Sequence, residues 1–313
     1  MSTVLVTGGA GFVGAALVKE LLSAGHHVSV LDDFSRGKAN RLPDNRRLRI
    51  LHADVRRRDA VAEAMQGCDI IFHLAYVQGT QTFYAEPRLV IDIALTGIMN
   101  ILHACEEQGG KSLFLVSSSE VYQVPPMVPT DETVPLSIPD VLNPRYSYGG
   151  GKQASEIATL AYARAGVLDR AVILRPHNIY GPDMGNEHVI PEFANRMRTL
   201  KGTDFPIQGT GQETRSFCYV DDCTAAFMIA LDKGADQTVY HVGTQEEVTI
   251  AELAVLVGQH YGKDIRVVPG TLPKGSPPRR LPDIGRMRAL GYEPQIPLSS
   301  GLPPTLDWYA NAA

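Results

Sequence analysis

The sequence predicts an α/β protein with a doubly wound parallel sheet and a smaller, irregular C-terminal lobe. Two observations predict the sheet. Short apolar runs alternate with helical patterns along the first 175 residues, and a glycine-rich turn joins the first apolar run to the first helical one. A third observation predicts the lobe, because prolines and glycines become frequent after Pro176 and the regular runs become shorter.

The first element is a strand at Val4–Val6, which breaks into the turn Thr7–Gly14 and continues with helical apolar spacing from Ala16 to Leu22. Glycines within this turn let the backbone bend tightly, and they let a pyrophosphate approach the free N–H groups at the start of the helix. The strand, turn and helix together predict that the chain binds a dinucleotide.

The second predicted strand, His27–Leu31, ends at Asp32, eighteen residues after Gly14. An acidic residue near this position accepts hydrogen bonds from an adenosine ribose in dinucleotide-binding (Rossmann) folds. Its charge repels a 2′-phosphate and so favours NAD over NADP, although Arg36 and Lys38 could pair with such a phosphate. The alternative is that Asp32 caps a turn formed by the residues that follow it.

Four more strands are predicted further along the chain, and their alternation with helices implies a parallel sheet covered on both faces. The strands are expected at 48–51, 70–72, 113–116 and 171–174, and the helices near 57–66, 88–108 and 148–165. Ligands of such sheets gather outside the carboxyl ends of the strands. The residues expected there are Thr7, Asp32, Asp54, His73, Ser117–Ser119 and Arg175–Asn178.

The same alternation predicts how the chain divides. Residues 1–175 form the predicted dinucleotide-binding domain, joined by residues from about 220 to 243, where the pattern is regular again and Val239–Val242 reads as a strand of the main sheet. The predicted substrate lobe consists of residues 176–219 and 244–313.

Composition excludes several classes of protein. With 313 residues, 44% of them hydrophobic, the chain can bury a sizeable core. Its 29 basic and 34 acidic residues give a net charge of −5 without a basic tract, so we expect no nucleic-acid and no membrane partner. The start does not resemble a leader, and we expect no apolar stretch near the ~20 residues of a membrane span, which predicts a cytoplasmic protein. The four cysteines lack metal-ligand spacing, so no metal site is predicted.

Tyr148 and Lys152 lie four residues apart at the start of a predicted helix, so both side chains lie on one face. A phenol with a pKa of ~10 is a poor base at neutral pH. An adjacent ammonium and a positive nicotinamide ring both favour the phenolate, which could then remove a proton from a sugar hydroxyl while hydride leaves the same carbon for NAD. The run Ser117–Ser119 follows a strand directly, where a hydroxyl could bond both the sugar oxygen and Tyr148.

Three glycines, Gly149–Gly151, separate Tyr148 from Lys152, and each weakens a helix by ~1 kcal/mol relative to alanine. We expect a coenzyme or substrate to approach this turn closely. A flexible start of the helix is the alternative explanation.

Together these features resemble the extended short-chain dehydrogenases/reductases, in particular their NAD-dependent nucleotide-sugar epimerase/dehydratase branch. The resemblance spans essentially the whole chain and rests on Thr7–Gly14, Asp32, Asp54–Val55, His73–Ala75, Ser117–Tyr122, Tyr148 with Lys152, and Arg175–Pro182. It implies a tightly held NAD that is reduced and reoxidised within one turnover, through a 4-keto sugar. It also implies a homodimer, with the helices near 88–108 and 148–165 as candidate contacts.

On the coenzyme side, the resemblance places Asp32 against the adenosine ribose and Asp54 with Val55 against the adenine. It places Ala75 beside the nicotinamide, and Lys152 is expected to bond the nicotinamide ribose. The full set of residues expected to contact NAD is Gly8, Gly11, Phe12, Val13, Gly14, Asp32, Asp54, Val55, Leu74, Ala75, Ser117, Lys152 and Pro176.

On the substrate side, the resemblance makes Ser118 the hydroxyl partner of the reacting sugar, with Ser119 and Glu120 as further catalytic candidates beside Tyr148 and Lys152. A bidentate guanidinium group suits the oxygens of a diphosphate. The residues expected to contact a nucleotide-diphosphate sugar are Asn178, Arg215, Arg279 and Arg280.

The sequence departs from the family pattern at two positions. The family often has serine immediately before the lysine, and this chain has Gly151. Tyr76 follows His73–Ala75, where a small residue is usual. We expect the first departure to change how the nicotinamide is held, and the second to reshape the sugar pocket.

Every branch of this family begins with oxidation at C4 of the sugar, so the fate of the ketone decides the reaction. We favour 4-epimerisation, which needs only Tyr148, Ser118 and a pocket in which the ketone can turn. A 4,6-dehydratase needs an acid, and the family's Thr-Asp-Glu is Ser118–Glu120 here, without the aspartate. Ser119–Glu120 together with Arg215 also resembles the pattern of UDP-glucuronate decarboxylases. The second hypothesis is therefore that the protein is such a decarboxylase. A non-catalytic NAD-binding sensor is the third, and the intact tyrosine–lysine pair argues against it.

Overall fold

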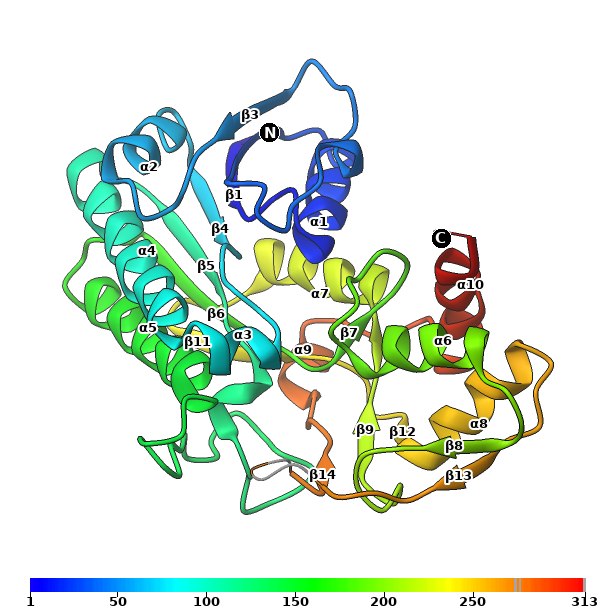
Figure 1. The fold of residues 1–313 in the computed structure, drawn as a ribbon. Helices are drawn as coiled ribbons and strands as arrows, with labels where there is room; N and C mark the ends of the chain where they lie inside the picture. The colour runs from blue at the N-terminus through cyan, green and yellow to red at the C-terminus, as the bar shows by residue number, and fades with distance from the viewer. Residues whose placement is uncertain (273–274, 276, 312–313) are drawn as a thin grey trace.

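Seven parallel strands form one sheet in the order β11-β6-β5-β4-β1-β2-β3, with helices on both faces (Figure 1), which confirms the predicted fold class. The computed structural model describes residues 1–272, 275 and 277–311. The strands are β1 (Thr3–Thr7), β2 (His27–Asp32), β3 (Leu48–His52), β4 (Ile70–His73), β5 (Ser112–Val116), β6 (Arg170–Pro176) and β11 (Thr238–Val242). The strand order reverses between β1 and β4, which is where open sheets of this kind bind their ligands.

Both faces of the sheet are buried, because its strands are apolar at successive positions. In β1, Val4 and Val6 belong to one core and Leu5 to the other, since neighbouring residues of a strand point to opposite faces. The first core contains residues of α1 (Phe12–Ser23) and α7 (Val220–Lys233). The second contains residues of α2 (Arg58–Ala64), α4 (Pro87–Gln108) and α5 (Tyr146–Arg164).

Helix α4 departs from one expectation of the sequence. Pro87–Gln108 has 22 residues and is, by length and composition, apolar enough to cross a membrane, so the chain does contain an apolar stretch of that size. More than half of its most apolar window is buried inside the protein, and residues such as Ile98 and Ile101 pack in the second core. The burial of this helix against the sheet accounts for its composition.

The C-terminal lobe is built from three main helices and short strands, in keeping with its irregular sequence pattern (Figure 1). Its core joins α6 (Val189–Thr199), α8 (Ile250–His260) and α10 (Leu298–Asn311). Three small sheets pair β7 (Ile179–Tyr180) with β10 (Cys218–Tyr219), β8 (Asp204–Pro206) with β13 (Arg266–Val268), and β9 (Thr214–Ser216) with both β12 (Glu247–Thr249) and β14 (Arg279–Arg280). Shorter helices are η1 (Ala39–Arg41), α3 (Thr80–Ala85), η2 (Ser119–Tyr122) and α9 (Gly285–Ala289).

Between the segments of the lobe, the chain returns once to the main sheet. After α7, β11 pairs in parallel with β6, so that Val239 lies beside Ile173 and Val242 beside Pro176. The lobe is thereby attached at two points to the edge of the sheet that carries β6. This arrangement sets the lobe next to the loops that follow β5 and β6.

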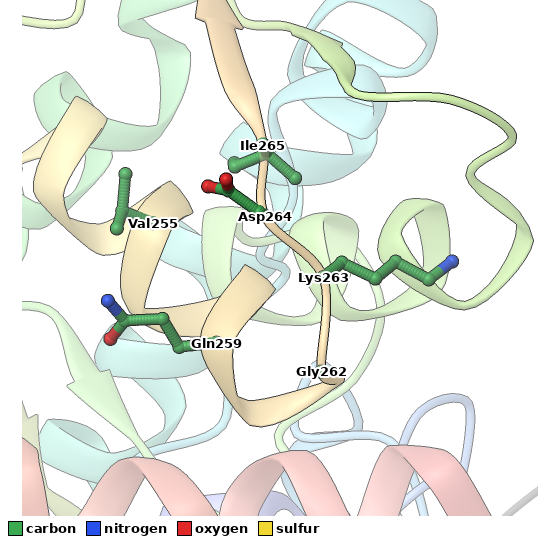
Figure 2. Close-up of a pocket in the computed structure, with 6 residues that line it drawn as sticks. All are labelled: Val255, Gln259, Gly262, Lys263, Asp264 and Ile265. Atoms are coloured by element: carbon green, nitrogen blue, oxygen red, sulfur yellow. The ribbon is translucent and has the colours of Figure 1, made fainter.

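A surface pocket of about 260 Å³ lies on the lobe beside α8 and the segment that leads into β13 (Figure 2). Lys263 extends away from it and donates to the carbonyl oxygens of Met197 and Leu200. The pocket is lined by Val255, Gln259, Gly262, Lys263, Asp264 and Ile265, none of which belongs to the predicted site. The residues of the predicted site lie instead around the carboxyl ends of the strands of the main sheet.

Candidate active site

The glycine turn after β1 is tightly enclosed by the rest of the protein. Gly8 has a φ of +69°, and a Cβ atom there would lie 2.8 Å from the backbone nitrogen of Ala75. A Cβ atom on Gly14 would overlap the carbonyl oxygen of Gly8. Helix α1 can therefore begin close to the end of β1 only because these positions are glycine. This is the close strand–helix packing that dinucleotide-binding turns require.

A polar chain fixes the neighbouring loop beside this turn. The register of β1 and β4 sets Thr7 beside His73, and Thr7 Oγ1 lies 2.8 Å from His73 Nδ1. The backbone nitrogen of Ala75 donates to the same hydroxyl at 3.2 Å, so the hydroxyl proton is free to bond Nδ1. Burial lowers the pKa of His73 to about 3, which keeps the ring neutral. Leu74 and Ala75 are thereby held against Gly8.

Asp32 ends β2 with its carboxylate directed at backbone N–H groups. It accepts hydrogen bonds from Ala10 at 2.9 Å and from Phe34 at 2.8 Å. Burial raises the pKa of this carboxyl, and the two hydrogen bonds oppose the rise. The bond to Phe34 is the turn cap that the sequence offered as an alternative. Each oxygen retains acceptor capacity, so capping and ribose binding are compatible.

The cations that follow Asp32 are already paired with carboxylates of the lobe. Lys38 Nζ lies 2.6 Å from Asp183, and Arg41 Nε lies 2.7 Å from the other oxygen of the same carboxylate. Arg36 pairs with Glu187 at 3.2 Å. These ion pairs tie the segment after β2 to the loop before α6. They also occupy the two side chains that could otherwise have paired with a 2′-phosphate.

The remaining residues predicted to contact the dinucleotide lie around the same strand ends. Asp54 forms an ion pair with Arg56 at 2.5 Å, and this side-chain hydrogen bond lowers the pKa of the carboxyl. Val55 is buried, and its carbonyl oxygen accepts from Asn100 at 3.0 Å. Phe12 and Val13 begin α1, Gly11 is its N-cap, and Pro176 is the last residue of β6.

Tyr148, Lys152 and Ser118 converge at the carboxyl end of β5. Lys152 Nζ donates to the carbonyl oxygen of Val116 at 2.6 Å and lies 6.0 Å from the centre of the Tyr148 ring. Gln78 donates to the Tyr148 hydroxyl at 3.1 Å. Ser118 is the N-cap of η2, and its hydroxyl accepts from the backbone nitrogen of Glu120 at 3.2 Å. The predicted catalytic residues therefore lie together.

Burial sets the ionisation of this pair. It raises the pKa of Tyr148 to about 12, although hydrogen bonds from Ser118 and Gln78 oppose the rise. It lowers the pKa of Lys152 to about 7, opposed by the charge of Glu156. The phenol is thus protonated at neutral pH in the protein alone, and a further positive charge beside it is needed to favour the phenolate.

Three arginines lie around Glu120, two residues after Ser118. Arg280 lies 2.7 Å from its carboxylate. Burial raises the pKa of Glu120, but Arg280, Arg145 and Arg215 outweigh this effect and hold it below the ordinary value. Burial, followed by the charge of Arg280, lowers the pKa of Arg215 to about 10. Positive charge exceeds negative charge at this place, which suits a diphosphate.

The other two residues predicted to contact the substrate, Arg279 and Asn178, form contacts away from Glu120. Arg279 forms a two-bonded ion pair with Glu247, at 2.6 and 2.8 Å, and is exposed. Since it precedes Arg280 in β14, its side chain points to the opposite face, so the structure does not bring the two arginines together. Asn178 adopts a positive φ of 42° and donates to Ser216 at 2.9 Å.

Ser117, the first residue after β5, belongs to a buried ion-pair network. Its hydroxyl donates to Glu156, which also pairs with Arg175 at 2.5 Å. Both charged side chains are 4% exposed. Arg175 donates further to Tyr122, whose hydroxyl lies 2.6 Å from His241 Nε2. The network thus joins α5 to the ends of β5, β6 and β11.

Two of the three glycines between Tyr148 and Lys152 lie close against other segments of the protein. Helix α5 begins at Tyr146, two residues earlier than predicted, so these glycines lie inside it. A Cβ atom on Gly149 would overlap the side chain of Gln123 and lie 2.9 Å from the carbonyl oxygen of Glu120. A Cβ atom on Gly151 would overlap the hydroxyl of Tyr76. At Gly149 and Gly151 the protein itself approaches closely, and the approach of a coenzyme or substrate stays a prediction.

Four residues of the site were missed by the sequence analysis: Gln78, Arg145, Glu156 and Arg175 in its ion pair. Two carried a usable signal. Glu156 stands one helical turn after Lys152, on the same face, and Arg145 immediately precedes α5. Gln78 lies in the loop between β4 and α3, where no local pattern indicates its partner.

Comparison with known proteins gives a consistent result. Residues 4–243 match the model of the NAD dependent epimerase/dehydratase family. The chain is 31% identical to the UDP-N-acetyl-alpha-D-glucosaminuronate decarboxylase of Bacillus cytotoxicus, over 97% of each protein. It is also 31% identical to the UDP-glucose 4-epimerase of Mycolicibacterium smegmatis, over 98% of each. Among solved structures, it resembles the UDP-glucose 4-epimerase of Thermus thermophilus in complex with NAD, with a TM-score of 0.87 and 28% identity, over 99% of this chain and all of the other.

The buried pair of Glu156 and Arg175 makes a testable prediction. Glu156→Gln should lower the free energy of unfolding by about 3–5 kcal/mol, because Arg175 is left charged, buried and without its counter-charge. Denaturant unfolding measures this change. Glu63→Gln is the matched control, since Glu63 pairs with Arg49 at 2.7 Å but both side chains are half exposed, and a loss below about 1 kcal/mol is expected there. Equal losses in the two variants would contradict the prediction.

Proposed function

The chain belongs to the NAD dependent epimerase/dehydratase family, and we propose that it is a nucleotide-sugar 4-epimerase that acts through a transient 4-keto sugar. The observation that carries this proposal is the arrangement of the buried Tyr148 and Lys152 beside Ser118 at the end of β5. The glycine turn beside Ala75 and the carboxylate of Asp32 fit the dinucleotide that the family uses.

The protein's own residues handle the proton in this reaction. When bound, NAD supplies the hydride chemistry by accepting hydride from C4 of the sugar and returning it. Tyr148 Oη takes the proton of the C4 hydroxyl and returns it once the ketone has presented its other face. Lys152 favours the ionised phenol through its charge, and Ser118 and Gln78 lower the pKa of the same phenol by hydrogen bonding.

The surroundings of Glu120 favour epimerisation over dehydration. A 4,6-dehydratase requires an acid that protonates a leaving hydroxyl, and position 119 is a buried serine. Glu120 does not replace that acid well, because its pKa is held below the ordinary value and Arg280 occupies its carboxylate at 2.7 Å. A carboxylate that is stabilised in its charged form is a poor proton donor at neutral pH.

A decarboxylase is the second candidate, and one observation favours it. Arg145, Arg215 and Arg280 provide more positive charge than Glu120 offsets, so the site could hold a sugar carboxylate in addition to a diphosphate. A relative that covers nearly the whole chain is named as a decarboxylase of a nucleotide-bound uronate. The two reactions share the first oxidation and differ in the mass of the product.

We assign the nucleotide-diphosphate sugar to the lobe formed by residues 176–219 and 244–313. Arg215 and Arg280 are the proposed diphosphate contacts, together with Arg145 from the start of α5. Asn178, at the end of the loop after β6, is also proposed to contact the nucleotide-sugar. Arg279 is left out of this set, because Glu247 holds it on the other face of β14.

Incubation with a panel of UDP-, dTDP-, GDP- and CDP-sugars tests the function. One of them should give a product of unchanged mass together with a transient absorbance in the NADH band. Tyr148→Phe should remove that absorbance and lower turnover by about 10²–10⁴-fold, because the catalytic base is lost. Tyr162→Phe, in the same helix but packed in the second core, is the matched control and should remain active. Loss of carbon dioxide would identify the decarboxylase, and a protein silent with every sugar would support a sensor.

The pairing of Arg36 and Lys38 with lobe carboxylates predicts the coenzyme preference. Calorimetry should give tighter binding of NAD than of NADP, because Asp32 repels the 2′-phosphate and no cation beside it is free of a carboxylate partner among the described residues. Asp183→Asn should narrow this preference by releasing Lys38 and Arg41. Asp204→Asn, which breaks an exposed pair with Arg266, should leave it unchanged. Tighter binding of NADP to the wild type would refute the role of Asp32.

We also propose a cytoplasmic homodimer joined through α4 and α5. These two helices pack together, and Leu95 on α4 and Ile157 on α5 are 41% and 67% exposed. Ile157→Glu should convert the dimer to monomers in sedimentation velocity, because a charge replaces an apolar contact. Val255→Glu, at a 38% exposed valine on α8, should leave the dimer intact. A monomeric wild type would contradict the proposal.

A further inference from the structure

The two departures from the family pattern, Tyr76 and Gly151, meet in the structure. A Cβ atom on Gly151 would overlap the Tyr76 hydroxyl and lie 2.7 Å from the Cβ atom of Ala94 on α4. The hydroxyl of Tyr76 therefore reaches the contact between α4 and α5. It is buried there, and it has no hydrogen-bond partner among residues 1–272, 275 and 277–311. Glycine at position 151 is what leaves room for it.

The ring of Tyr76 lies over the ammonium of Lys152. The nitrogen is 3.8 Å from the centre of the ring, well inside the ~6 Å range of a cation–π interaction. The same ring and the ring of Tyr148 meet in a T-shaped arrangement, with centres 5.2 Å apart and planes at 83°. Phe83 stacks on Tyr148, with ring centres 4.9 Å apart and planes at 19°. Tyr76 thus contacts both members of the catalytic pair from a loop outside their helix.

We propose that Tyr76 is a positioning residue for Lys152 and that Gly151 is the gap that admits it. The inference rests on the proposed function, since it concerns the same catalytic pair. An ammonium has three N–H donors. The carbonyl oxygen of Val116 takes one at 2.6 Å, and the face of the Tyr76 ring occupies a second direction. The remaining donor is left for the coenzyme ribose.

The groups that face Lys152 determine the direction of the effect. Glu156 and Tyr148 come from its own helix, Tyr76 from the loop after β4, and His73 from β4 itself. His73 is neutral, so the ammonium is favoured against its burial by Glu156, by the carbonyl oxygen of Val116 and by the ring of Tyr76. An aliphatic side chain in place of the ring would keep the burial and lose the attraction. The amine would then lose its proton more readily, and the phenol of Tyr148 would ionise less readily.

A double-mutant cycle tests whether Tyr76 and Gly151 form one unit. Gly151→Ala should lower the melting temperature, and the loss should be about 2–4 °C smaller when Tyr76→Leu is also present. The contact with Ala94 is common to both backgrounds and cancels. Gly150→Ala is the matched control, because its Cβ atom would lie 3.4 Å from Ile138 and no loss is expected. Additive losses would overturn the pairing. This measurement uses no substrate, so its outcome is independent of the proposed reaction.

The pH profile of turnover tests the positioning role. Tyr76→Leu should lower turnover at neutral pH about tenfold. It should also raise the pKa of the acidic limb, since Tyr148 ionises less readily, and lower the pKa of the basic limb, since Lys152 loses its proton more readily. Both limbs would thereby move inward, because the ring no longer favours the ammonium. Tyr76→Phe keeps the ring and should keep both limbs. A lower plateau with unmoved limbs, or equal damage in the two variants, would overturn the role of the ring. A wild type that is inactive on every sugar would instead overturn the proposed function.

Discussion

The candidate site depends on one buried charge, the ammonium of Lys152. This residue is 2% exposed, and burial lowers its pKa to about 7. Its nitrogen is bonded to the carbonyl oxygen of Val116, the last residue of β5, so the charge is fixed to the sheet and does not move freely on its helix. Electrostatic interactions are stronger in such surroundings than in water. A displacement of the nitrogen away from Tyr148 would therefore weaken its attraction for an ionised Tyr148.

A second buried charge docks the same helix. Glu156, one turn after Lys152, accepts from Ser117 after β5 and pairs with Arg175 in β6. Replacing a buried ion pair by apolar residues is often neutral for stability, so strength alone does not explain this pair. Its geometry does, because one carboxylate ties α5 to the ends of two neighbouring strands. Helix α5 is thereby placed against the loop that carries Ser118.

The sequence predicts the parts of this protein that are local patterns. Each strand of the sheet, the glycine turn and the pair of Tyr148 and Lys152 spans only a few residues, so periodicity or spacing reveals them. The ion pair of Glu120 with Arg280 joins residues 160 positions apart, which no periodicity shows. A strand of two residues likewise gave no sign that Arg279 and Arg280 face opposite ways. The glycines before Lys152 did signal a close approach, but the approaching atoms belong to other segments of the chain.

The arrangement around Glu120 is consistent with both proposed reactions, 4-epimerisation and decarboxylation. Arg145, Arg215 and Arg280 repel one another, and the charge of Arg280 already contributes to the lowered pKa of Arg215. A carboxylate among them reduces this repulsion while no anionic ligand is bound, so the three guanidinium groups can stay close together. Under the proposed function, a diphosphate that binds there meets guanidinium groups already held together and takes over part of the role of Glu120. Glu120 thus helps to keep the three arginines together, whether or not it also takes part in the chemistry of the sugar.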